Sequence, residues 1–234
     1  PFFAQAWTQK LCYYVNSSLC PEGDPEVKRI ADAFKSSGYD WSTLVTELLS
    51  SPITTHAEVT ATAKSEGEVV AVSRRDHLCA ALESRLGLSD VCGLQATTAK
   101  QKRAVIPTIA AGLPSDGYGR GSTAPVLPNE PTLFFRAGTE NICETVAGSV
   151  IDVAAAKQVQ GVKQWSSGKP DAAIADFVSL MMGLVSTDPR AGKAQMLLRA
   201  HFDAAMQQGA SASNALKSTF VAACLSPSFV SIGL

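Results

Sequence analysis

Residues 24–52 read DPEVKRIADAFKSSGYDWSTLVTELLSSP, and the first half of this stretch predicts a helix with a defined start and end. Asp24 is a natural N-cap and Pro25 suits the first turn of a helix. Apolar side chains then recur at helical spacing, and Gly38 predicts where the helix ends. The expected inward stripe consists of Val27, Ile30, Ala31 and Phe34.

The second half of the stretch predicts another helix, from Trp41 to Ser50. Asp40 is positioned to cap it, and Pro52 is expected to stop it. The apolar side of this helix would hold Trp41, Leu44, Val45, Leu48 and Leu49. Two helices in direct succession favour an all-α fold class.

Helical patterns continue through most of the chain. In the first of them Trp7, Leu11, Tyr14 and Val15 lie near helical spacing, so we expect this side to face inward. The three tryptophans, Trp7, Trp41 and Trp165, are expected in or at the rim of the core rather than on a sugar-binding platform. The other predicted helices span residues 4–15, 74–86, 97–111 (bent at Pro107), 140–157, 170–184, 189–208 and 211–224.

Two segments interrupt the helical pattern. Residues 58–72 alternate and are rich in β-branched side chains, which predicts a minor extended element. Residues 112–133 are dense in glycine and proline, which predicts one long loop, and its interspersed apolar side chains favour an ordered one. We therefore expect a single all-α domain over residues 1–234, a bundle of about eight helices that this loop could divide into 1–111 and 134–234.

Six cysteines without a CxxC motif predict three disulfides that staple the bundle. Zinc sites use cysteine or histidine pairs two to four residues apart, whereas the short cysteine separations here run from position 12 to 20 and from 79 to 92. Six cysteines allow 15 connectivities, of which pairing neighbours is the simplest. Loop-closure entropy then gives the bridges about 2.6, 3.0 and 4.5 kcal/mol as upper values. The pairs would be Cys12 with Cys20, Cys79 with Cys92, and Cys143 with Cys224.

Disulfides form in oxidising compartments, so we expect a periplasmic, cell-surface or secreted protein. The chain begins at Pro1, as expected for a mature fragment or for a domain of a longer polypeptide. Its longest apolar runs fall short of 18 residues, so no membrane-spanning helix is expected. A net charge of −1 offers no strong field for capturing nucleic acid.

Polar side chains gather in and just after the predicted loop, and we interpret residues 112–141 as a surface that contacts protein. Helix capping and pairing across the loop are the structural alternative. Asp116, Asn129 and Glu130 could also supply oxygen ligands to calcium. The candidate binding residues are Asp116, Tyr118, Arg120, Asn129, Glu130, Arg136, Glu140 and Asn141.

Catalytic and cofactor motifs are not recognisable in the sequence. It lacks GxSxG, HExxH, P-loop and GxGxxG patterns, and it lacks the CxxCH of covalent haem. Non-covalent haem held by His201 with Met181 or Met196 is an alternative, although lone histidines and methionines on apolar helices belong more often to cores. We expect no cofactor.

Three patches carry a family resemblance. They lie within residues 6–52 (AWTQKLCYYVNS, DPEVKRI and GYDWSTLVTELLSSP), at residues 131–144 (PTLFFRAGTENICE) and at residues 224–228 (CLSPS). They resemble the C-terminal module of large exported proteins of planctomycetes and myxobacteria, which are built from domains of unknown function. The resemblance implies export and supplies no catalytic residues. Some such proteins carry cytochrome c motifs in other domains, and this chain has none.

Together these features predict a non-catalytic binding or assembly module of the bacterial cell envelope. The expected partner is protein, either the rest of a parent polypeptide or another envelope component. An accessory subunit of an extracellular redox or hydrolytic system is the alternative, and a carrier of non-covalent haem or pigment is a third reading.

Overall fold

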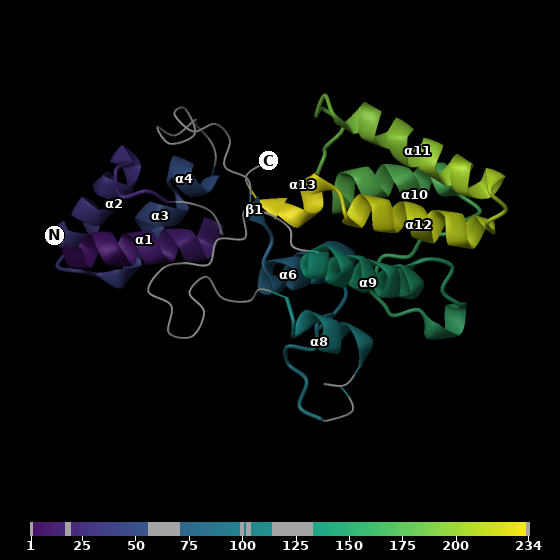
Figure 1. Cartoon of the computed structure of the whole chain (residues 1–234), viewed down its shortest axis with the longest axis horizontal. Helices are drawn as coiled ribbons and strands as arrows, with labels where there is room; N and C mark the ends of the chain where they lie inside the picture. Colours follow the sequence, from purple (N-terminus) through teal and green to yellow (C-terminus); the bar gives the residue numbers. More distant parts are fainter. Residues whose placement is uncertain are drawn as a thin grey trace. The chain divides into compact units, whose positions relative to one another are not determined.

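The computed structural model describes residues 2–16, 20–55, 71–98, 101, 104–113 and 133–232. These residues are predominantly helical, and they confirm the predicted disulfide-stapled all-α class (Figure 1). They belong to two compact units. The N-terminal unit contains the chain up to Arg74 and the C-terminal strand, and the C-terminal unit contains Arg75–Leu113 and Pro131–Val230. We expected a single domain, with a division at the 112–133 segment as a possibility; the division into units instead falls at Arg74, because Arg75–Leu113 belong to the same unit as the C-terminal helices.

The N-terminal unit packs three helices around one small core. The predicted caps of the second and third helices are confirmed: Asp24 accepts a hydrogen bond from the Glu26 amide, and Asp40 accepts one from the Thr43 amide. Pro52 follows the end of the third helix, as expected, and is also the first residue of a further short helix. The elements are α1 (Phe2–Asn16), α2 (Pro25–Ser36), α3 (Trp41–Leu49), α4 (Pro52–Thr55) and the antiparallel pair β1 (Ala71–Val72) with β2 (Ser231–Ile232).

The buried face of α1 differs from the predicted one. Trp7 and Tyr14 were expected inside but are 39% and 58% exposed. The buried stripe instead runs through residues spaced four apart: Ala4, Thr8, Cys12 and Asn16. The Cys12–Cys20 disulfide is itself buried, so it fixes which side of α1 faces the core.

The C-terminal unit contains the remaining helices and an aromatic core. Trp165, Phe177 and Phe220 contact one another with ring centroids 5.0 to 6.1 Å apart. The Cys143–Cys224 disulfide joins α9 to α12, and Cys79–Cys92 ties α6 to the loop after it. The elements are α6 (Arg75–Leu86), α8 (Val105–Ala110), α9 (Leu133–Val150), η1 (Ala155–Lys157), α10 (Pro170–Asp176), the π-helical η2 (Phe177–Met181), α11 (Ala191–Gln207), α12 (Ala212–Cys224) and α13 (Pro227–Val230).

Two predicted helices differ from the structure by seven residues or more at one or both ends. The helix expected at 140–157 is α9, which begins at Leu133 and ends at Val150. It ends there because Asp152 adopts a φ of +50° and donates its amide to the carbonyl of Trp165. The helix expected at 97–111 is not continuous: Gln101 is helical, Ala104 has an extended backbone, and α8 begins at Val105 and places Pro107 in its first turn, where proline is tolerated.

Some expectations fall outside the described residues. Of the extended element expected at 58–72, only Ala71 and Val72 are described, and they form β1. Of the loop expected at 112–133, residues 114–132 lie outside the described part. In the part of the chain that is described, none of the helices combines the length and apolar character needed to cross a membrane.

Removing the Cys143–Cys224 bridge should destabilise its unit more than removing Cys12–Cys20 destabilises the other. The first bridge closes an 81-residue separation and the second one of 8 residues. Loop-closure entropy therefore predicts losses of up to about 4.5 and about 2.6 kcal/mol for the paired alanine variants. Urea unfolding followed by circular dichroism measures both losses, and equal losses would contradict the entropic account.

Candidate functional site

Four partly exposed aromatic side chains of the N-terminal unit form one cluster, and three of them contact a buried ring. We call Phe3, Trp7, Tyr39 and Trp41 the aromatic surface; their exposed fractions are 57%, 39%, 44% and 47%. Phe34, beneath them, is only 2% exposed. Large aromatic side chains that gather on a surface mark interaction sites more often than scattered ones do.

The rings of the aromatic surface contact one another mainly edge to face. Trp7 and Trp41 lie with centroids 5.5 Å apart at 88°, and Phe3 and Tyr39 lie 5.2 Å apart at 86°. Phe34 connects the two pairs, with Tyr39 at 5.5 Å and Trp41 at 6.4 Å. Such contacts are favourable beyond simple burial, so the rings hold one another in place.

The turn between α2 and α3 places two of these rings. Gly38 and Tyr39 both have positive φ, 75° and 65°. The Tyr39 amide donates to the Phe34 carbonyl at 3.0 Å, which closes the end of α2. Positive φ is strained for a residue with a side chain, at a cost of about 1 kcal/mol or more. The ring contacts of Tyr39 with Phe3 and Phe34 offset this cost.

The cap of α3 fixes the neighbouring tryptophan. One carboxylate oxygen of Asp40 accepts hydrogen bonds from the Thr43 amide at 2.9 Å and from the Thr43 hydroxyl at 2.8 Å. These hydrogen bonds lower the pKa of the Asp40 carboxyl. Because Trp41 is the first helical residue after Asp40, the cap also sets the direction in which the Trp41 side chain projects from the helix.

One cationic side chain lies at the aromatic surface. The Lys10 ammonium stands 5.4 Å from the centroid of the Trp7 ring. This cation–π contact covers part of the Trp7 ring and adds positive charge at the edge of the apolar patch.

The binding residues predicted from the sequence are described only in part. Arg136, Glu140 and Asn141 lie on the exposed side of α9, where the Asn141 amide donates to the Ala137 carbonyl at 2.8 Å. No described residue forms an ion pair with Arg136 or Glu140. The remaining predicted residues lie outside the described ones, and so does the predicted calcium set; they are Asp116, Tyr118, Arg120, Asn129 and Glu130.

The candidate haem ligands do not meet at one open cleft. Met181 has no exposed surface, whereas His201 is exposed and shares a 2.8 Å hydrogen bond with Ser218. Met196 lies on α11 five residues before His201, a spacing that puts the two side chains on different faces of the helix. Likewise, within the described ranges, no three histidine, cysteine, aspartate or glutamate side chains are grouped as metal ligands.

Comparison of this chain with known protein families, with curated proteins and with solved structures finds no match. The candidate site is therefore inferred from the arrangement of its own residues.

The aromatic surface was not anticipated from the sequence, because the three tryptophans were expected in or near the core. A signal was present in the order Gly38, Tyr39, Asp40, Trp41. A residue that ends one helix followed directly by the cap of the next predicts a tight turn, and such turns lie at the molecular surface. Aromatic residues on either side of the cap are therefore expected at the surface as well.

The stability of the N-terminal unit should fall in acid partly through Asp40. A carboxyl whose pKa is lowered by folding stabilises the folded state above its unfolded pKa, about 3.9 for aspartate, and this contribution disappears as pH falls through the folded pKa. The Asp40→Asn variant keeps a capping acceptor and should lose this part of the pH dependence. Urea unfolding between pH 7 and pH 3 measures it, and an NMR titration that placed Asp40 at or above its ordinary pKa would contradict it.

Proposed function

We propose that this chain is an exported, non-catalytic module that binds a protein partner through the aromatic surface. The observation that carries the proposal is the group of four exposed rings held by mutual contacts around Phe34. Tryptophan and tyrosine are the residues most enriched among those that dominate the binding energy of protein interfaces.

The geometry of the rings favours protein over carbohydrate. A sugar ring stacks on a flat aromatic face, and a platform for several sugars needs rings in a common plane. Here the pairs Trp7–Trp41 and Phe3–Tyr39 are within a few degrees of perpendicular. Perpendicular rings do not present one flat face, and such an uneven apolar surface suits the apolar side chains of a protein segment better than a sugar ring.

Export is supported by the three disulfides, which persist in oxidising compartments. The partner is the rest of a parent polypeptide or another component of the bacterial envelope, in keeping with the resemblance to the C-terminal modules of large exported proteins. Arg136, Glu140 and Asn141 of α9 remain candidates for a further contact, since they face solvent.

A selection from a displayed peptide library tests the proposal. The purified chain is the bait, and every enriched peptide is then measured against both the chain and the Trp41→Ser variant. We expect apolar peptides that bind the chain at least ten-fold more tightly than they bind Trp41→Ser, because loss of an interface tryptophan typically costs more than 1 kcal/mol. Isothermal titration of the selected peptides measures the difference.

The Tyr14→Ser variant is the matched control, since Tyr14 is 58% exposed on the same helix as Trp7 but is not one of the four clustered rings. It should bind the selected peptides within about two-fold of the unchanged chain. Peptides that bind the Trp41→Ser variant as tightly as the unchanged chain would overturn the proposal. So would binding to a glycan array that requires Trp41 while no peptide is enriched.

A further inference from the structure

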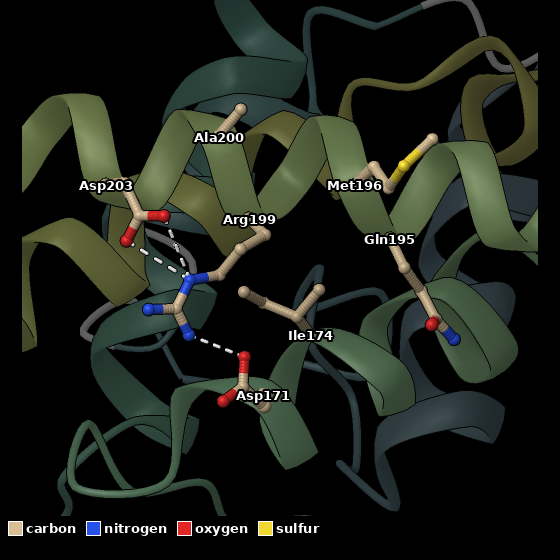
Figure 2. A pocket seen from close by; sticks show the side chains of 7 residues that line it. All are labelled: Asp171, Ile174, Gln195, Met196, Arg199, Ala200 and Asp203. Carbon is tan, nitrogen blue, oxygen red and sulfur yellow. Dashed lines mark hydrogen bonds and ion pairs between the residues drawn. The ribbon is translucent and has the colours of Figure 1, made fainter.

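A groove separates α10 from α11 in the C-terminal unit (Figure 2). Its volume is about 450 Å³, within the range of roughly 300–1,000 Å³ typical of ligand sites. It lies in a different unit from the aromatic surface and shares no residue with it. The side chains that line it are Asp171, Ile174, Gln195, Met196, Arg199, Ala200 and Asp203.

The α11 side of the groove presents an uncovered helix face. Met196, Ala200 and Asp203 stand at positions i, i+4 and i+7, so they form one stripe along α11. Met196 is 68% exposed, and its neighbour Leu197 is 62% exposed. Methionine adapts its shape to an apolar partner, and Ala200 between the two larger side chains permits close approach of a second backbone.

The charged end of the groove has an excess of negative charge. The Arg199 Nε lies 3.1 Å from both carboxylate oxygens of Asp203, and its Nη1 pairs with Asp171 across the groove (Figure 2). One guanidinium thus faces two carboxylates, which leaves a net charge of about −1. The carboxylates remain accessible, since the Asp171 and Asp203 side chains are 83% and 45% exposed.

We propose that this groove binds an amphipathic helix of a partner protein that carries apolar residues and a lysine or arginine. The apolar residues contact Met196, Ala200 and Ile174, and the cation joins Asp171 and Asp203. An anionic partner is disfavoured because the two carboxylates outnumber the single guanidinium, which already pairs with both. Helix-in-groove recognition of this kind is a recurring mode of peptide binding.

The spacing of the stripe predicts the pattern that the partner must have. Met196 and Asp203 are seven residues apart, which corresponds to about 10.5 Å along a helix. A partner helix that lies alongside α11 therefore needs its cation about two turns from the residue that contacts Met196. Apolar and basic residues seven positions apart meet this requirement.

Binding of a synthetic helix tests the inference. The probe is a fluorescein-labelled 18-residue peptide of leucine and lysine, with leucines on one face and lysines seven positions from the central leucines. We expect the intact chain to bind it, and the double variant Asp171→Asn/Asp203→Asn to bind it at least ten-fold more weakly in low salt. The difference should shrink as salt rises, because exposed charges are screened. Fluorescence anisotropy measures both.

Two controls separate the groove from general attraction. Asp188→Asn removes an acid of the same unit that pairs with Arg190 away from the groove, and it should change binding less than two-fold. Met196→Ser should weaken binding about five-fold through the apolar end. Equal binding of a scrambled peptide of the same composition, or no loss in the Asp171 and Asp203 variant, would overturn the inference. The Trp41→Ser variant should bind the peptide unchanged, so this outcome is independent of the proposed function.

Discussion

The Cys12–Cys20 disulfide determines which side of α1 faces water, and the exposed rings of the N-terminal unit follow from that choice. Both cysteines are buried, so Cys12 must point inward. Successive residues of a helix are turned by 100°, hence burying Thr8 and Cys12 turns Trp7 toward the edge of the core. Asn16, one turn further, donates to the Ile53 carbonyl at 3.1 Å and secures the same rotation from the other end of the helix.

The second constraint is the corner between α2 and α3, where the backbone is held in a strained conformation. Tyr39 keeps its positive φ because its ring contacts Phe3 and Phe34 while its amide closes α2. The hydrogen bonds to Asp40 then start α3 directly at Trp41. Strain of this kind persists only where the surroundings fix it, and the result is a set of rings positioned before any partner arrives.

The sequence was sufficient for features that depend on local chemistry. The caps at Asp24 and Asp40 follow from residue type and spacing, and the observed disulfides are the simplest of the 15 pairings that six cysteines allow. Features that depend on tertiary contacts could not be predicted. The end of α9 is fixed by a bridge between Ile151 and Trp165, and the exposure of Trp7 by the burial of the Cys12–Cys20 bridge in the core, which the pairing alone does not reveal. An amphipathic pattern cannot show whether a tryptophan or a neighbouring threonine is buried when a disulfide sets the rotation of the helix about its axis. The candidate site was missed for that reason.

The Cys12–Cys20 disulfide also helps to explain how the small N-terminal unit stays folded while four of its aromatic side chains are exposed to water. Fully burying one aromatic side chain stabilises a fold by about 1.5–3 kcal/mol. The four residues of the aromatic surface are only partly buried, so each contributes only part of this stabilisation. A core of this size has little stability to spare. The Cys12–Cys20 crosslink, at up to about 2.6 kcal/mol, offsets roughly what one of those side chains would have contributed. A fold stapled in this way can leave Phe3, Trp7, Tyr39 and Trp41 partly exposed and available for another molecule, because the crosslink replaces part of the stability that covering them would give.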